Sequence, residues 1–265
     1  MTLSVHPRGT LSAGNFDYGR TVPLVLLHAF PLDHRMWEPV AAQLADLPVL
    51  LVDLPGAGMS PVVAPTLEAA AGELAGTLTA LGYTRWAVGG CSLGGYVALA
   101  LARLYPDALA GLALIDTKAS ADDDAVRVAR HDVAREVLAA GSAASVIGMA
   151  DVLVGTAART KRPELVDEVG SWIASSTPAG LAWAEAAMAS RPDSSGTLMR
   201  LSCPACVVVG EDDQFSPPGV ARLMAAAIPG AVLTVVPRAG HLSPVEGPAP
   251  VAGALRALMA RVSVS

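Results

Sequence analysis

The stretch Gly89–Gly95, GGCSLGG, places one serine, Ser92, among four glycines. Glycine loses more backbone freedom on folding than any other residue, so such a cluster needs a structural reason. Residues 85–88 before it are largely apolar and strand-like, whereas residues 96–107 after it are helix-like. The sequence therefore predicts that Ser92 lies on a sharp turn from a strand into a helix, where glycines two residues away on either side relieve crowding.

Short apolar runs recur on both sides of this turn, and they are continuous rather than alternating. That pattern is typical of strands buried on both faces of a parallel sheet. Helix-like segments separate the runs, which predicts βαβ units and an α/β fold with a mostly parallel central sheet flanked by helices. The expected strands are 22–27, 48–54, 86–90, 112–116, 205–210 and 231–236.

The alternation of strands and helices stops between about residues 118 and 201, where alanine-rich helical patterns follow one another. We interpret residues 118–195 as a helical cap insert. Residues 1–117 and 196–265 then form the core domain.

Composition excludes several classes of partner. The chain of 265 residues has a formal net charge of −6 and no long basic run, which argues against nucleic acid and anionic membrane surfaces. No signal peptide or apolar stretch of about 20 residues is evident, so we expect a cytoplasmic protein. Three cysteines do not make a disulfide framework.

Two further patterns have simple structural interpretations. We read the C-x-x-C spacing at Cys203–Cys206 as the lead-in to a strand, and Asp122–Asp124 as a solvated helix start. Cys91, beside the serine, is interpreted as a small buried residue rather than a nucleophile. The sequence therefore predicts no cofactor and no metal.

A serine hydroxyl becomes a strong nucleophile only when a base removes its proton. Among five histidines, His241 lies in a loop after the last predicted strand, and we identify it as the base. His28 also follows a strand, but we interpret it as a hydrogen-bonding residue that shapes its own loop. The base needs a carboxylate that fixes its tautomer. The candidates are Glu211, Asp212, Asp213 and Asp116, and sheet geometry leaves the choice open.

Several segments, in order and over nearly the whole chain, resemble the α/β-hydrolase superfamily. The resemblance implies the α/β-hydrolase fold with a helical cap. Within the superfamily, the segments look most like those of small bacterial esterases and enol-lactonases. The matching segments are HAFPLDHRMW (28–37), DLPGAGMS (53–60), GCSLGG (90–95), GEDDQFSP (210–217) and AGHLSPVEGP (239–248).

The same resemblance assigns roles to residues. It implies a catalytic triad of Ser92, Asp213 and His241, in the family's chain order. It also implies an oxyanion hole made by the backbone N–H groups of Phe30 and Leu93. One position departs from the pattern: Ala29 stands where the family usually has glycine, and a positive φ there would strain alanine.

We therefore expect a serine hydrolase that cleaves a carboxylic ester, lactone or thioester. Haloalkane dehalogenases and epoxide hydrolases use aspartate as the nucleophile on this turn, so Ser92 excludes both classes of enzyme. A cofactor-free perhydrolase or haloperoxidase-like activity, C–C bond hydrolysis and a ligand receptor of the same fold stay open. We expect a small-molecule substrate with an apolar acyl or alkyl part, and candidate pocket residues are Trp37, Trp172, Trp183 and Phe215.

Overall fold

A seven-stranded sheet forms the centre of the molecule. The computed structural model describes residues 2–13 and 21–262. The strand order is β1-β3-β2-β4-β5-β6-β7; β1 runs antiparallel to β3, and the other strands are parallel. The α/β fold with a mostly parallel sheet is therefore confirmed. The strands are β1 (Val5–Gly9), β2 (Leu24–Leu27), β3 (Pro48–Val52), β4 (Trp86–Cys91), β5 (Leu109–Ile115), β6 (Ala205–Gly210) and β7 (Val232–Val236).

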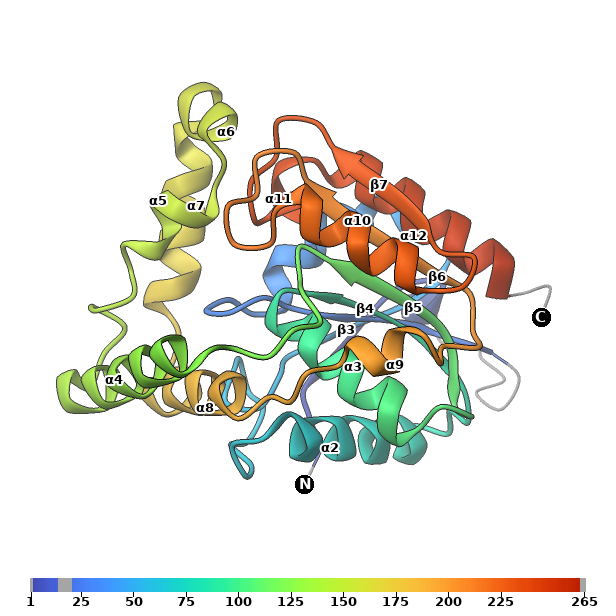
Figure 1. Cartoon of the computed structure of the whole chain (residues 1–265), viewed down its shortest axis with the longest axis horizontal. Helices are drawn as coiled ribbons and strands as arrows, with labels where there is room; N and C mark the ends of the chain where they lie inside the picture. Colours follow the sequence, from blue (N-terminus) through green and yellow to red (C-terminus); the bar gives the residue numbers. More distant parts are fainter. Residues whose placement is uncertain (1, 14–20, 263–265) are drawn as a thin grey trace.

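Helices cover both faces of the sheet (Figure 1). α12 packs on β4 to β7 and against α1, while α3 packs on β2, β4 and β5 and against α2 on the opposite face. Their bounds, with those of the short helices, are η1 (Thr10–Ala13), η2 (His34–Trp37), α1 (Glu38–Ala41), η3 (Ala42–Leu44), α2 (Leu67–Ala80), α3 (Leu93–Leu104), α10 (Pro218–Ala227), α11 (Ser243–Glu246) and α12 (Pro248–Val262).

Capping groups mark both ends of α2. The Thr66 hydroxyl accepts a hydrogen bond from the Ala69 amide at 3.1 Å, which satisfies one of the free donors of the first turn. The chain leaves the helix through Gly82, whose φ of 90° favours glycine.

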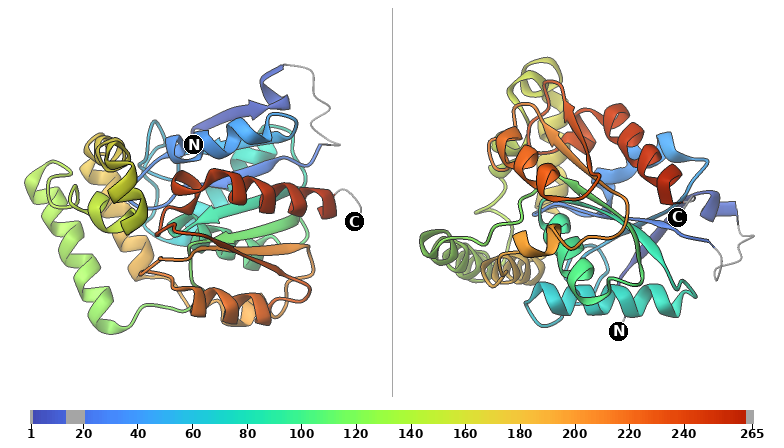
Figure 2. Two further views of the ribbon diagram at one scale, coloured as in Figure 1. Left: turned by 90° about the horizontal axis from the view of Figure 1, so that it is seen from above. Right: turned by 45° about the vertical axis from the view of Figure 1, so that its right-hand side comes forward.

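Between β5 and β6 the chain forms only helices in the described structure. They are α4 (Asp124–Ala140), α5 (Met149–Leu153), α6 (Thr156–Lys161), α7 (Pro163–Ala174), α8 (Pro178–Ala189) and α9 (Ser195–Leu198). Figure 2 shows α4 to α8 standing together beside one end of the sheet. We call these helices the α4–α8 segment; their status as a separate domain stays a prediction.

The end of the sheet beside this segment is where the parallel strands finish. Phe30 follows β2, Ser92 follows β4, Asp116 follows β5, and Asp213 and His241 follow β6 and β7. Carboxyl ends of parallel strands meet at one sheet edge, so these residues gather there. Within the described ranges, no helix combines the length and apolar character that a membrane span requires.

Candidate active site

The turn that carries Ser92 is as tight as the sequence predicts. A Cβ on Gly90 would lie 2.2 Å from the carbonyl oxygen of Gly94, and a Cβ on Gly94 would lie 2.2 Å from that of Leu27. Side chains at either glycine would therefore clash with backbone. Ser92 itself has a φ of 51°, an uncommon conformation for a residue with a side chain, held by the strand and helix on either side.

Ser92, His241 and Asp213 form one buried chain of hydrogen bonds. Ser92 Oγ lies 2.9 Å from His241 Nε2. His241 Nδ1 lies 2.9 Å from each carboxylate oxygen of Asp213. Asp213 in turn accepts hydrogen bonds from the amides of Phe215 and Ser216, which fix its orientation. With Nδ1–H donating to the carboxylate, Nε2 is left as the acceptor for the serine proton.

The second candidate carboxylate, Asp116, has other partners. Its two oxygens accept hydrogen bonds from the amides of Gly210 and Ser243, at 2.8 and 3.0 Å. Burial raises the pKa of this carboxyl, and the nearby charge of Asp213 raises it further. Asp116, directly after β5, therefore links the end of β6 to the segment after β7, and its oxygens make no hydrogen bond to the His241 ring.

Glu246 holds the loop that carries His241, a role that the sequence analysis missed. Its Oε1 accepts hydrogen bonds from the Gly240 and Leu242 amides, and its Oε2 accepts one from Gly155 in the α4–α8 segment. Burial raises the pKa of this carboxyl, while the amide donors favour its ionised form. A glutamate among apolar residues and prolines, five residues after His241, was the available sequence signal.

The two residues expected to supply the oxyanion donors line one cavity. The amides of Gly94, Gly95 and Tyr96 donate to carbonyl oxygens, which leaves Leu93 as the first-turn donor without a partner among the described residues. Phe30 and Leu93 line the same small cavity of about 20 Å³ next to His28. The role of both amides as donors to a negative charge on a substrate oxygen stays a prediction. Phe30 also lines the cavity that holds Ser92.

His28 and Ala29 shape the loop beneath these donors. His28 Nδ1 donates to the Ala29 carbonyl at 3.0 Å, and its Nε2 accepts from the Leu54 amide at 2.9 Å. Burial lowers the pKa of His28, so its ring stays neutral. The interpretation of His28 as a structural residue is confirmed. Positive φ angles among described non-glycine residues occur at Ser92, Asp116 and Arg238, so Ala29 carries no such strain.

A cavity of about 120 Å³ opens over Ser92 and His241. Its apolar wall comes from both the core and the α4–α8 segment, and includes Phe30, Met149, Leu153, Met188 and Phe215. Its polar wall was not expected from sequence and consists of Tyr96, Lys118, Arg130, Glu185 and Ser216. The cavity can therefore hold a small molecule with both apolar and charged parts.

The four aromatic residues expected in the pocket separate into three groups. Phe215 lines the Ser92 cavity, with its ring centroid 4.9 Å from that of His241. Trp183 lines the smaller neighbouring cavity beside Phe30 and Leu93. Trp37 is fully buried in the hydrophobic core, and the buried Trp172 of α7 lines neither cavity.

The three acidic residues before α4 do not behave alike. Asp123 is the N-cap of α4 and accepts a hydrogen bond from the Val126 amide, and Asp124 opens the helix. The expectation of a solvated helix start is wrong for Asp122, which is 5% exposed and ion-paired. Its partners, Arg130 and Arg191, are 8 and 69 residues away, so no local pattern reveals the pairing.

All three cysteines are free. Cys206 is buried within β6 and Cys203 lies just before it, so the interpretation as a strand lead-in is confirmed. Cys91 is fully buried, and burial raises the pKa of its thiol well above the usual value. It therefore stays a neutral thiol next to Ser92, as expected for a small core residue.

One group of metal-ligating side chains was not expected: His6, His34 and Asp53. His6 Nε2 lies 2.9 Å from one oxygen of Asp53, and His34 Nδ1 lies 2.8 Å from the other. The two imidazole rings are stacked, with centroids 3.5 Å apart and an angle of 15° between their planes. Ring lone pairs lie in the ring plane, so nearly parallel stacked rings cannot aim at one ion without rotating. The arrangement favours direct hydrogen bonding over chelation.

The family and the proteins that this chain resembles agree with the geometry of the site. A family model described as the alpha/beta hydrolase fold matches residues 22–248. A pimeloyl-[acyl-carrier protein] methyl ester esterase from Chromobacterium violaceum is 31% identical over 237 residues, which covers 84% of this chain and 88% of that protein.

Solved structures are similar over almost the whole chain. A thermophilic esterase from Thermogutta terrifontis, with malate bound, has a TM-score of 0.89 and 38% identity, covering 98% of this chain and 93% of that one. An enol-lactonase from Burkholderia xenovorans LB400 has a TM-score of 0.85 and 24% identity, covering 97% and 96%. At 24% identity, the similarity to the enol-lactonase shows the shared fold alone.

Proposed function

From the premise that the chain belongs to the α/β-hydrolase family, we propose that it is a serine hydrolase of carboxylic esters, lactones or thioesters. The observation that carries the proposal is the hydrogen-bonded chain from Ser92 through His241 to Asp213, which opens into a cavity. Esters are the favoured class, because similar proteins of 31% and 38% identity are described as esterases.

The proposed reaction proceeds through an acyl-enzyme. Ser92 Oγ attacks the acyl carbonyl carbon while His241 Nε2 takes the hydroxyl proton. The amides of Phe30 and Leu93 hold the negative charge that develops on the carbonyl oxygen. His241 then gives its proton to the leaving oxygen, and a water molecule repeats the sequence to release the acid. Asp213 keeps His241 in the required tautomer and stabilises the imidazolium.

The direct test replaces the nucleophile. Ser92→Ala should fold normally and lose hydrolysis of methyl heptanoate by several powers of ten, because the remaining amides and cavity supply only residual catalysis. Ser216→Ala removes another hydroxyl of the same cavity but keeps the backbone amide that donates to Asp213, so it is the matched control and should retain most of the activity. Circular dichroism checks the fold of both variants.

Covalent labelling supplies an independent readout. A fluorophosphonate should modify Ser92 in the wild-type protein, which mass spectrometry of the labelled peptide detects. A folded Ser92→Ala protein with near-normal turnover would overturn the assignment. Absence of both labelling and turnover across esters, lactones and thioesters would favour a ligand receptor, whereas turnover only with peroxide would favour a perhydrolase.

A further inference from the structure

A buried ion cluster forms part of the wall of the Ser92 cavity. Its centre is Asp122, whose oxygens receive both terminal nitrogens of Arg191 at 2.5 and 2.6 Å and Nε of Arg130 at 2.7 Å. Arg130 also donates to Glu185 at 2.8 Å. Arg130 and Glu185 themselves line the cavity, so the cluster joins the α4–α8 segment to the catalytic side of the core.

Lys118 is a third cation directed to the same carboxylate. Its Nζ lies 3.5 Å from Asp122 Oδ1, longer than a good hydrogen bond, because Asp122 is already occupied by the two guanidinium groups. The Lys118 side chain is 28% exposed and lines the cavity with Ser92. Three cations against the two carboxylates Asp122 and Glu185 leave one positive charge in this wall.

The positive charge that neither carboxylate neutralises is that of Lys118 rather than that of Arg130 or Arg191. Arg191 is 3% exposed, forms a bidentate pair with Asp122 and stacks its guanidinium 4.2 Å from the centre of the Tyr96 ring. Arg130 holds two carboxylates at once. A charge in a largely buried wall is costly unless a partner neutralises it. Lys118 lines both the Ser92 cavity and a smaller hollow that already holds Arg103 and Arg191, so the Ser92 cavity is the side where an anionic substrate can reach both Lys118 and Ser92.

We propose that Lys118 binds a carboxylate on the substrate, so that the enzyme acts on anionic half-esters of short dicarboxylic acids. The inference rests on the proposed function and specifies its substrate class. The ester carbonyl would lie at Ser92, the methylene chain against Phe30, Met149 and Met188, and the free carboxylate at Lys118. Glu185 does not repel this group in proportion to its charge, because Arg130 already neutralises it.

The test compares three methyl esters of similar length and different charge. Monomethyl adipate carries a carboxylate, methyl heptanoate is neutral, and methyl 6-aminohexanoate carries an ammonium group. The wild-type kcat/KM should be highest for the anion, by at least about tenfold over the neutral ester, since charge-assisted hydrogen bonds are strong. It should be lowest for the cation, and the preference should shrink as salt screens the charges.

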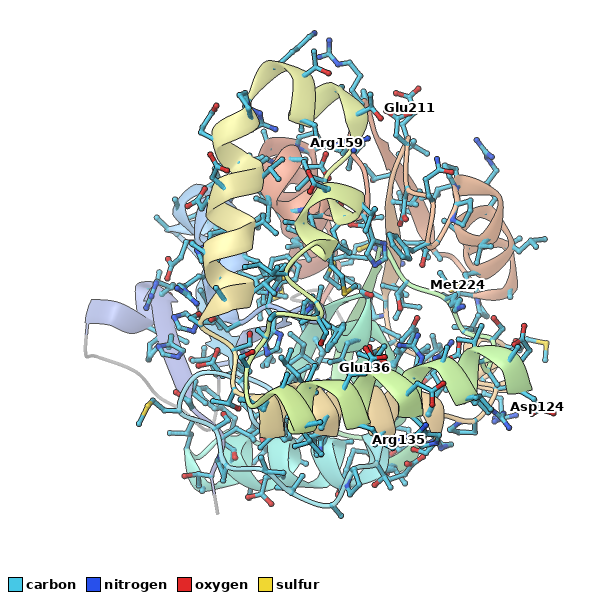
Figure 3. All side chains as sticks on the ribbon, turned by 90° about the vertical axis from the view of Figure 1, so that its left-hand side faces the viewer. Asp124, Arg135, Glu136, Arg159, Glu211 and Met224 are labelled. Carbon is cyan, nitrogen blue, oxygen red and sulfur yellow. The ribbon has the colours of Figure 1, made fainter. Side chains whose placement is uncertain are left out.

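Variants of Lys118 assign the preference to this side chain. Lys118→Met should reduce the ratio of kcat/KM for monomethyl adipate to that for methyl heptanoate to near one, and Lys118→Arg should retain most of it. Lys161→Met removes an exposed lysine of α6 and should leave the ratio unchanged. Arg135 and Glu136 are exposed residues of α4, labelled in Figure 3, and do not line the Ser92 cavity, so they serve as further neutral positions.

The outcomes separate this inference from the proposed function. Ser92-dependent hydrolysis of methyl heptanoate with no preference for the anion, or an unchanged ratio in Lys118→Met, overturns the inference alone. Absence of any Ser92-dependent ester hydrolysis overturns both. If Lys118→Met does not fold, competitive inhibition of the wild type by adipate replaces it: inhibition that weakens with salt supports carboxylate binding, and no inhibition overturns it.

Discussion

Asp116 and Asp213 are both buried carboxylates that follow neighbouring strands, yet their hydrogen-bond partners give them different roles. Asp213 meets the His241 ring directly, whereas Asp116 is occupied by the amides of Gly210 and Ser243. Burial and the charge of Asp213 raise the pKa of Asp116, so its ionised form is disfavoured next to a carboxylate that must stay charged.

This contrast predicts the effect of neutralising each carboxylate. Asp213→Asn should lower kcat by about 10⁴-fold, because an amide favours the wrong histidine tautomer. Asp116→Asn should retain most of the activity. The NH₂ half of the new amide would face one of the two backbone N–H donors, and this mismatch costs about 1–3 kcal/mol of stability. Asp212→Asn, at an exposed position, is the control. Steady-state kinetics on folded variants decide; an inactive Asp116→Asn with an active Asp213→Asn would contradict the assignment.

At this scale, short motifs were sufficient for some residues and not for others. Ser92 could be predicted because its glycines enforce the turn locally, and His241 because it follows a strand that ends at the same edge. Strand positions alone did not separate Asp213 from Asp116, and the family resemblance favoured Asp213. The cluster of Asp122, Lys118 and Arg191 could not, because it depends on where α8 and the following loop pack on the core. Pairings across such separations leave no periodic signal in a single sequence.

Among the elements, Asp53 joins three of them at the edge of the sheet. It follows β3 and binds His6 of the antiparallel strand β1 and His34 at the start of η2. Burial alone would raise the pKa of Asp53, but hydrogen bonds from His34 and His6 hold it well below its usual value. Gly58 packs against this carboxylate so closely that a Cβ there would lie 2.1 Å from Asp53 Oδ2.

The depressed pKa predicts how the stability of this edge depends on pH. A carboxyl with a lowered folded-state pKa contributes stability above its unfolded value of about 3.9, and that contribution is lost as the pH falls below it. Asp53→Asn should therefore cost about 2 kcal/mol at neutral pH, by loss of charge-assisted hydrogen bonds, and the deficit should narrow in acid. Urea unfolding of both proteins from about pH 7 to about pH 3 measures it.

Asp167→Asn provides the comparison, since Asp167 is exposed on α7 and should show no such deficit. A deficit for Asp53→Asn that is absent at neutral pH, or that grows in acid, would contradict the argument.

The elements also differ in how well sequence predicts them. Buried parallel strands are continuous apolar runs, and β6 has the bounds expected of it. Strand β1, with the sequence VHPRG, was missed. It is an antiparallel edge strand that is only partly buried, so it needs no apolar run and tolerates proline and charge. The helices of the α4–α8 segment were predicted as helical and as a cap on the sheet, but the packing of α4 against α8 was not predicted.

In the whole molecule, the residues proposed for catalysis and the residues that hold the edge strand β1 to the sheet lie in different places. The residues proposed for catalysis lie at the carboxyl edge beneath the α4–α8 segment, and the Ser92 cavity is lined from both sides. His6, His34 and Asp53 do not line that cavity, and their hydrogen bonds hold β1 and η2 to the sheet. The molecule thus separates the group with metal-ligand chemistry from the groups proposed to move protons and hold the substrate.

This separation predicts that hydrolysis does not depend on a metal ion. In the proposed reaction His241 moves the proton and two amides hold the oxyanion, so a Lewis acid has no step to perform. Dialysis against EDTA should leave kcat/KM for methyl heptanoate unchanged, and added zinc should not increase it. Thermal unfolding with and without zinc tests the histidine pair separately, because an ion chelated there would raise the midpoint without altering turnover. Activity lost on dialysis and restored by zinc would contradict the prediction, since it would place a metal in the reaction itself.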